Sequence, residues 1–405
     1  MGAAEKLFQL MAEKKASDLF ASVGSPITIK IGGIHVPVNQ QLMTPDGMWS
    51  FLEEITTPEQ IQQFRQSNEL NYGYPVPGIG SFRVSVFQQR GTPGLVIRFI
   101  PFQIPEFESL GLPKTLRDII NEQRGLLLFV GATGSGKSTT IASLIEARNQ
   151  SKTGHILTLE DPIEFTFRSK KSIINQREVG FDALDYKVAL KNAMRQAPDV
   201  IFIGEIRDQE TMTAAISYAQ SGHLCISTMH ANNSYHALGR ILSMYPLETR
   251  GALLNDLSAC LKAIVSQRLL RSKKGARVAA CEILLNTKHI SGLIEQGDVN
   301  NIRDAIEKSL APGSQTFEQS LYRMVKEDLV HQDDALAASD SPNNLLWLLQ
   351  NADDNKLNQN KVAPTRTSHQ DTAFGQSSSA GPQDENEVVP NQAGQAVYEE
   401  FTMDV

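Results

Sequence analysis

An eight-residue stretch constrains the fold of this chain more than any other feature of its sequence. It reads Gly131-Ala132-Thr133-Gly134-Ser135-Gly136-Lys137-Ser138 and matches the phosphate-binding loop pattern G-x-x-x-x-G-K-[ST] at every fixed position. An apolar run of strand length, residues 125–130, precedes it, and residues 139–147 have the pattern of a helix. Strand, glycine-rich turn and helix are the context in which backbone N–H groups and a helix N-terminus bind phosphate. The stretch therefore predicts a nucleotide site on an α/β sheet, with Lys137 reaching the outer phosphates and Ser138 holding Mg²⁺.

The residues around this loop have the pattern of a parallel sheet. From residue 115 onward, short apolar runs alternate with helical patterns, which is typical of strands covered on both faces. We expect an amphipathic helix over 250–270, a strand over 277–285 and several helices up to about residue 349. The further strands of the sheet are predicted at 156–159, 200–204 and 224–228.

Residues 1–100 predict a separate, small α+β domain with a mostly antiparallel sheet. A helix is expected over 3–15, and Gly32-Gly33 lies between two apolar runs as a hairpin turn. Thr57, Pro58 and Gln60 form the start of a helix with a capping box. The segment 81–87 alternates strictly between apolar and polar residues, as a half-buried strand does, and 95–100 is the next strand. Residues 101–114, which contain three prolines and a glycine, are predicted to be an interdomain linker, leaving 115–350 for the nucleotide-binding domain.

Charge is distributed unevenly along the chain. The net charge is −7, and residues 351–405 hold nine acidic and three basic residues, so this segment carries −6 and the other 350 residues carry −1. The near-neutral body gives no sign of a nucleic-acid surface. The acidic segment 351–405 has few large apolar residues and is predicted to be disordered. A hydrophobic cluster near its end, Val397-Tyr398 and Phe401, is either a docking peptide or part of an untethered tail.

Composition also bears on location. No apolar run approaches the roughly 18 residues of a membrane span, and no signal pattern begins the chain, so we expect a protein without a transmembrane segment. Cys225, Cys260 and Cys281 form no C-x-x-C pair and are expected to be core residues in a reducing compartment.

Carboxylates are expected at the ends of the strands next to the phosphate loop. Glu205 directly follows the run 200–204 and is expected to orient or activate a water molecule, the alternative being a surface acid at a strand end. Glu160, Asp161 and Glu164 follow the strand 156–159, where α/β sheets bind ligands. These three acids belong either to an Mg²⁺ and water network or to a solvated turn, and the sequence does not rank them.

Histidine and arginine side chains are the remaining candidates. His223 and His230 bracket the run 224–229, and His230 falls on the side of the phosphate loop, where it either senses the terminal phosphate or has a structural role. Four arginines are candidates for neutralising phosphate charge, within one chain or across a subunit boundary, with surface ion pairs as the alternative: Arg83, Arg98, Arg195 and Arg207.

Four motifs in order resemble those of the secretion and type IV pilus ATPases. Gly131 to Thr139 is similar to their Walker A motif, and residues 159–165 to their Asp box. Residues 198–208 resemble the Walker B motif and 221–230 the His box. The resemblance covers about residues 1–345.

This resemblance implies a PAS-like N-terminal domain, a RecA-like ATPase domain with C-terminal helices, and a ring-shaped homohexamer that binds ATP and Mg²⁺. By the same resemblance, Glu205 is the catalytic base, Glu164 the functional acid of the Asp box and His230 a phosphate contact. Arg83 and Arg98 become nucleotide contacts. The implied location is cytoplasmic, at the inner face of the inner membrane, with a membrane platform protein of the pilus machine as partner.

The short N-terminal domain is similar to the pilus retraction branch, PilT and PilU. In PilT-type proteins a motif of the type Ala-Ile-Arg-Asn-Leu-Ile-Arg-Glu occurs where this chain has His289-Ile290-Ser291-Gly292-Leu293-Ile294-Glu295-Gln296, without either arginine. With the acidic tail, this resembles the PilU-type accessory motors that act with a PilT-like sister ATPase in twitching motility. Two alternatives stay open: a nucleotide-binding adaptor ring that couples to a sister motor, and a pilus extension or type II secretion ATPase.

Overall fold

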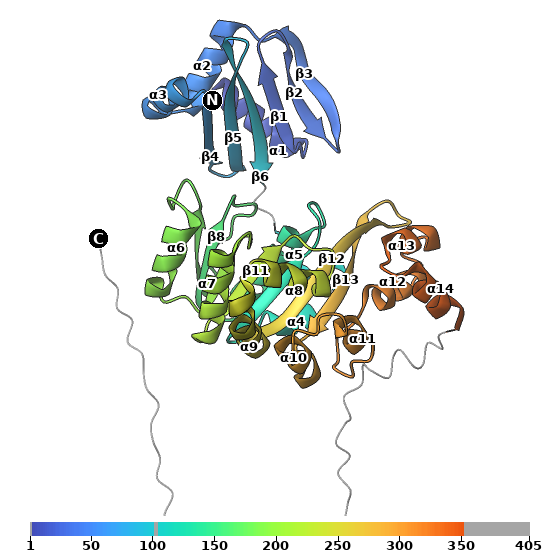
Figure 1. The fold of residues 1–405 in the computed structure, drawn as a ribbon. Coiled ribbons are helices and arrows are strands. Elements are labelled where there is room, and N and C mark those ends of the chain that lie inside the picture. Colours follow the sequence, from blue (N-terminus) through green and yellow to red (C-terminus); the bar gives the residue numbers. More distant parts are fainter. Residues whose placement is uncertain (1, 101–103, 352–405) are drawn as a thin grey trace, which may run out of the picture. The chain divides into compact units, whose positions relative to one another are not determined.

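The computed structural model describes residues 2–100 and 104–351 (Figure 1). The predicted acidic tail lies outside the described residues from position 352 on, as do three residues of the predicted linker. Two sheets organise the described chain, one with six strands and one with seven.

The first sheet is antiparallel throughout. Its strand order is β3-β2-β1-β6-β5-β4, and every neighbouring pair is antiparallel. Helices α1 to α3 bury Phe8, Leu52 and Phe64 in one core with Phe82 and Val84 of β5. The elements are α1 (Ala3–Glu13), β1 (Asp18–Ser22), β2 (Pro26–Ile31), β3 (Ile34–Leu42), α2 (Pro45–Ile55), α3 (Pro58–Ser67), β4 (Glu69–Val76), β5 (Gly80–Gln89) and β6 (Thr92–Ile100).

Local signals in this part were informative, with one omission. The capping box at the start of α3 is present, because Thr57 Oγ1 accepts from Gln60 N and Gln60 Oε1 accepts from Thr57 N. Strand β4 was not predicted, since Gly73 and Pro75 interrupt its pattern. Its place at the edge of the sheet explains why proline is tolerated there, as an edge strand has backbone groups without a ladder partner.

The second sheet carries the phosphate loop. Its order is β13-β12-β7-β11-β10-β8-β9, with parallel pairs from β12 to β9 and β13 antiparallel at the edge. Its elements are η1 (Phe107–Leu110), α4 (Thr115–Ile119), β7 (Gly125–Val130), α5 (Lys137–Ser151), β8 (Gly154–Glu160), β9 (Ser172–Glu178), α6 (Tyr186–Ala193), η2 (Met194–Gln196), β10 (Val200–Ile203), α7 (Gln209–Gln220), β11 (Leu224–Met229), α8 (Ser234–Ser243), η3 (Leu247–Thr249), α9 (Arg250–Cys260), β12 (Leu261–Arg271), β13 (Arg277–Leu285), α10 (Lys288–Glu295), α11 (Ile302–Glu307), α12 (Phe317–Lys326), α13 (Gln332–Ala338) and α14 (Pro342–Asn351).

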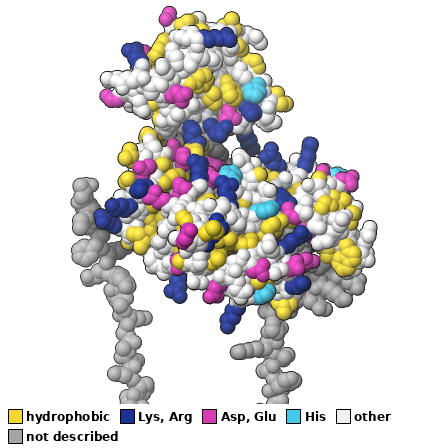
Figure 2. Space-filling model, in the orientation of Figure 1, with side chains coloured by type: hydrophobic (Ala, Val, Ile, Leu, Met, Phe, Trp, Pro, Cys, Tyr) yellow, Lys and Arg dark blue, Asp and Glu magenta, His cyan; other side chains and the backbone are white. Residues whose placement is uncertain are grey.

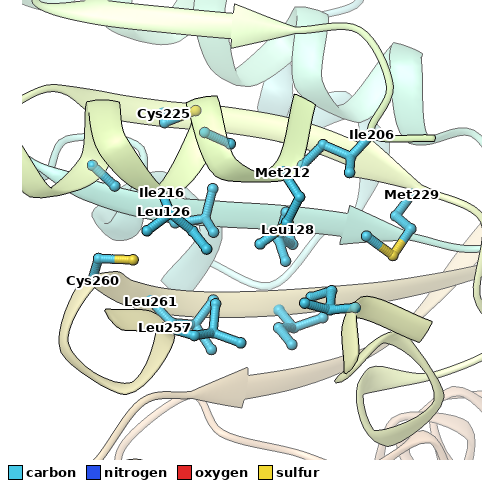
Figure 3. Packing of buried hydrophobic residues seen from close by; sticks show 14 of the residues in the cluster. Leu126, Leu128, Ile206, Met212, Ile216, Cys225, Met229, Leu257, Cys260 and Leu261 are labelled. Atoms are coloured by element: carbon cyan, nitrogen blue, oxygen red, sulfur yellow. The ribbon is translucent and has the colours of Figure 1, made fainter. Parts of the chain in front are cut away.

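Strand β7 is buried on both faces, as its apolar run predicts. Leu126 and Leu128 point toward Met212 and Ile216 of α7 in Figure 3. Leu127 and Phe129, which alternate with them along the strand, belong to a second core with α4 and α5. Because successive side chains of a strand point to opposite faces, helices cover the sheet from both sides and hold the end of β7 in place.

The helix expected over 250–270 is wrong in its second half. Helix α9 ends at Cys260, and β12 runs from Leu261 to Arg271 between β7 and β13. Ile264 and Val265 are both fully buried, on opposite faces. A central strand covered on both sides is apolar at successive positions, which periodicity alone does not separate from a buried helix.

Helices α12 to α14 form a smaller core beside β12 and β13 (Figure 1). Phe317 and Leu321 of α12 pack there with Leu270 and Leu345.

On the face shown in Figure 2, acidic and basic side chains are interspersed. No described helix combines the length and the apolar character that crossing a membrane requires. The three cysteines are buried and free, as predicted.

Candidate functional site

The phosphate loop follows β7 directly and ends where α5 begins at Lys137. Gly134 and Gly136 have φ angles of +77° and +87°, which side chains rarely adopt. A Cβ atom at Gly136 would lie 2.8 Å from Nε2 of Gln267 on β12. Glycine is therefore favoured at Gly136 by its conformation, and an added Cβ atom would also displace the end of the Gln267 side chain.

Lys137 lies across the loop that it belongs to. Its Nζ donates to the carbonyl oxygens of Gly131 at 2.8 Å and Ala132 at 3.0 Å. Burial lowers the pKa of Lys137, while the negative charges of Glu205 and Glu164 oppose that shift. Its ammonium group is thus hydrogen-bonded to the loop carbonyls in the same cavity as the two carboxylates, where anionic phosphate oxygens would find a positive charge.

Gln267 is a part of the site that the sequence did not indicate. Its Oε1 accepts from Oγ1 of Thr140 at 2.9 Å, and both side chains are buried. This contact fixes the first turn of α5 to β12. The residue was missed because the segment was expected to be a helix, in which position 267 has no relation to the phosphate loop.

Glu205 lies at the centre of a polar cluster just beyond β10. Its Oε1 is 3.2 Å from Nε2 of His230, and its Oε2 accepts from Nε of Arg207 at 2.8 Å. Nη1 of Arg207 also lies 3.4 Å from Oδ2 of Asp161. The parallel order β11-β10-β8 brings these side chains together, because the carboxyl ends of all three strands meet at one edge.

Glu160 ends β8 and is almost fully buried. Burial raises its pKa from 4.5 to about 7, although Oε1 accepts hydrogen bonds from Thr158 Oγ1 at 2.6 Å and Gln176 Nε2 at 3.1 Å. A carboxyl group with a pKa near neutrality exchanges a proton easily at physiological pH. Glu160 therefore differs in environment from Asp161 and Glu164, although the sequence did not rank these three acids.

A cavity of about 240 Å³ joins these groups. Part of its wall is apolar and is formed by Ile141, Ile145, Phe165, Phe167 and Phe202. The rest of the lining contains four residues of the phosphate loop, all three acids of the predicted Asp box and four residues that follow or lie in β10 and β11. These residues are Thr133, Gly134, Lys137, Ser138, Glu160, Asp161, Glu164, Glu205, Arg207, Thr228 and His230.

Some candidates lie elsewhere. Arg195 is in η2 and precedes β10, and His223 precedes β11, so both lie at the strand ends opposite to Glu205 and His230. His223 instead has its Nδ1 3.0 Å from Oγ of Ser221. These positions give Arg195 and His223 no part in the cavity.

Arg83 and Arg98 are neighbours in the first sheet. They face each other across the β5–β6 pair, and Arg98 Nε donates to Asp18 Oδ1 at 2.9 Å. Their role as nucleotide contacts stays a prediction.

Gly204, the residue before Glu205, lies close to two neighbouring groups. A Cβ atom there would lie 3.0 Å from the hydroxyl oxygen of Tyr186 and 3.3 Å from the carbonyl oxygen of Leu159. Any larger side chain would have to displace one of these groups. Tyr186, at the start of α6, was not singled out from the sequence because an isolated tyrosine carries no motif.

Comparison with known proteins places this geometry in a family. Residues 75–330 match the family model described as type II/IV secretion system protein. The chain is 43% identical over 346 residues to the type IV pilus ATPase PilU of Pseudomonas aeruginosa, which covers 85% of this chain and 91% of that protein. It is 35% identical over 339 residues to the type IV pilus retraction ATPase PilT of the same organism, covering 84% and 98%.

A solved structure has the same fold. The crystal structure of the pilus retraction motor PilT with bound ADP superposes with a TM-score of 0.79 at 37% identity, covering 84% of this chain and 97% of that one. The family model spans more than half of the chain, and both relatives are matched over most of their length. The chain therefore belongs to the type II/IV secretion system protein family, and its fold is the mixed α/β fold of the secretion ATPases.

Proposed function

We propose that this protein is an ATPase that powers type IV pilus retraction, as a PilU-type accessory motor acting with a PilT-like sister ATPase. One observation carries the proposal of hydrolysis: Glu205, with its Oε1 3.2 Å from His230 Nε2, lines the same cavity as Lys137 and Ser138 of the phosphate loop. A base, a phosphate contact and a phosphate-binding lysine are the parts that phosphoryl transfer to water requires.

In this proposal the loop residues Gly131 to Thr139 hold the phosphates of ATP. Lys137 leaves the carbonyl oxygens of Gly131 and Ala132 and donates to the outer phosphates instead. Glu205 accepts a proton from the attacking water, and His230 contacts the terminal phosphate. Glu164 supports the water network as the acid of the Asp box.

The residues present also suit Mg²⁺. The Ser138 hydroxyl and the carboxylates of Glu164 and Glu205 line one cavity, and oxygen donors are what this cation prefers. No cluster of three or more His, Cys, Asp or Glu side chains among the described residues is arranged to hold a metal on its own. This fits an ion held by one or two protein oxygens together with substrate phosphates. When bound, Mg²⁺ would supply charge neutralisation at the phosphate oxygens.

Several finer features belong to the same proposal. The first domain, residues 1–100, is PAS-like and residues 115–350 form a RecA-like domain with C-terminal helices, joined by the linker 101–114. The protein assembles as a homohexamer, with Arg83 and Arg98 as nucleotide contacts, and works in the cytoplasm on an inner-membrane platform protein. The support is the match to PilT over 98% of its length and the shared fold.

A second candidate is an adaptor ring that binds nucleotide and couples to a sister motor without needing its own turnover. One observation favours it: both arginines of the PilT-type motif are missing from residues 289–296, which form α10 and its end. The accessory-motor proposal and the adaptor differ in whether hydrolysis by this chain matters.

Steady-state ATP hydrolysis by the purified protein tests this choice. Wild type is compared with Glu205→Ala and with Glu248→Ala, an exposed acid of η3 outside the cavity, and oligomer size is measured on the same samples. A hexamer whose hydrolysis falls by about a hundredfold or more in Glu205→Ala, but not in Glu248→Ala, supports the motor. A hexamer that binds ATP without turning it over would overturn the motor and leave the adaptor.

A further inference from the structure

Two arginine side chains hold the loop that carries His230. This loop, residues 230–233, joins β11 to α8. Arg240 of α8 donates Nη1 to the His230 carbonyl oxygen at 2.8 Å. Arg268 of β12 donates Nη2 to the Asn232 carbonyl oxygen at 3.2 Å. The backbone is therefore fixed on both sides of Ala231.

Arg268 connects this loop to a distant part of the chain. Its guanidinium also donates to the Asp340 carboxylate and lies over the Phe317 ring, 4.0 Å from the ring centroid. Oδ2 of Asp340 accepts from Nδ2 of Asn233 at 2.9 Å, and Asn233 is buried. The Arg268 and Asp340 side chains are only 24% and 17% exposed, so the pair is more strongly coupled than an ion pair on the open surface.

Asp340 in turn is tied to the C-terminal helices. It lies between α13 and α14, and the buried Glu318 of α12 holds both of its neighbours. Oε1 of Glu318 accepts from Ser341 N at 2.8 Å and from Ser339 Oγ at 3.1 Å. A displacement of α12 would therefore move Asp340, and with it the side chains that hold residues 232 and 233.

We propose that Arg268 and Asp340 are positioning residues that couple helices α12 to α14 to the loop 230–233, and so set the distance between His230 and Glu205. The proposal rests on the function proposed above, in that His230 is taken to act on the terminal phosphate. It adds a route by which a displacement of helices α12 to α14 changes the cavity, although neither Arg268 nor Asp340 contacts nucleotide.

The expected kinetic effect is on turnover. Asp340→Ala leaves Arg268 and Asn233 without their shared acceptor and so loosens the loop, although Arg268 keeps the carbonyl oxygens of Asn232 and Ala338 as acceptors. The kcat should fall by roughly tenfold because reacting groups lose alignment. KM for ATP should change by less than about twofold, since the phosphate loop is untouched. Asp340→Asn keeps an acceptor for Asn233 but loses the charge, so its effect should be smaller.

Hydrogen exchange tests the coupling without relying on hydrolysis. The amides of residues 232–236 should exchange faster in Asp340→Ala and Asp340→Asn than in wild type. Glu210→Ala is the control, because it breaks the exposed Lys187–Glu210 ion pair between α6 and α7 without touching the loop or helices α12 to α14. Unchanged exchange of 232–236 in both Asp340 variants would overturn the proposal.

A double-mutant cycle shows whether the effect passes through His230. In a His230→Ala background, Asp340→Asn should lower kcat by less than about twofold, because the group that it positions is gone. An equal loss of kcat in both backgrounds would mean that Asp340 acts elsewhere and would overturn the proposal. If the wild type itself does not hydrolyse ATP, the proposed function fails, while hydrogen exchange still decides the coupling.

Discussion

Glu160 is held almost without contact with water, which favours its neutral form. Its folded-state pKa of about 7 lies above the value of 4.5 expected for the unfolded chain, so between these values the folded protein binds the extra proton. Stability from this group is therefore complete below about pH 4.5 and decreases as the pH rises toward 7. The slope is roughly 1.4 kcal/mol for each pH unit in that window.

Replacing this carboxyl group by an amide should remove that pH dependence. In Glu160→Gln, the free energy of unfolding should change less between pH 5 and 8 than in wild type. Urea unfolding at both pH values measures the difference, and Glu248→Gln, at an exposed position, is the control. The assignment to Glu160 would be wrong if wild type and Glu160→Gln showed the same change in the free energy of unfolding between the two pH values.

The two central glycines of the phosphate loop should respond differently to alanine. Gly134 and Gly136 share a positive φ, but only Gly136 has a neighbour, Nε2 of Gln267, at 2.8 Å from the added Cβ atom. We expect Gly136→Ala to lose about 1–3 kcal/mol of stability and most nucleotide affinity, and Gly134→Ala to lose only about 1 kcal/mol from backbone strain. Thermal unfolding with and without ATP compares them, and equal losses would show that the contact with Gln267 does not matter.

At the residue scale, the sequence indicated those candidate site residues that belong to motifs with a fixed spacing. Lys137, Glu205 and His230 do line one cavity, since each follows a strand of one parallel sheet. Gln267 and Tyr186 could not be predicted, because their proximity depends on strand order and on a close approach that no local pattern encodes.

Secondary-structure elements were predictable where one local signal dominates. The start of α3 followed from a capping box, and the hairpin of β2 and β3 from two glycines with φ of +57° and +89°. Strand β12 and the edge strand β4 were not, because the first is apolar on both faces and the second contains proline. Packing against partners distant in sequence makes the β12 segment a strand, and the edge position of β4 allows it to contain proline.

Helix α8 offers a test of an element on its own. Gly239 is exposed in its middle, and a Cβ atom there would meet nothing within 4 Å. Gly239→Ala should therefore stabilise the protein by about 0.5–1 kcal/mol through helix propensity alone, without altering ATP turnover. Chemical denaturation measures this gain. Destabilisation instead would mean that α8 requires a flexible position next to Arg240, which holds the His230 carbonyl oxygen.

At the scale of the whole molecule, the proposed motor and the proposed adaptor differ in what hydrolysis by this chain contributes. If it works as a motor, hydrolysis by its subunits contributes to retraction. Glu205→Ala subunits would bind ATP through an intact phosphate loop and then stop at the water step. Lys137→Ala subunits would lack the lysine that reaches the phosphates and would bind nucleotide weakly.

These two variants should therefore differ when the PilT-like partner is intact. We expect Glu205→Ala to slow retraction more than Lys137→Ala, because a subunit locked with ATP obstructs its partner while one without nucleotide does not. Retraction speed of individual pili under load measures this, with Glu248→Ala as the control. Full speed with both variants would show that turnover by this chain is dispensable and would identify it as an adaptor, in keeping with the missing arginines of residues 289–296.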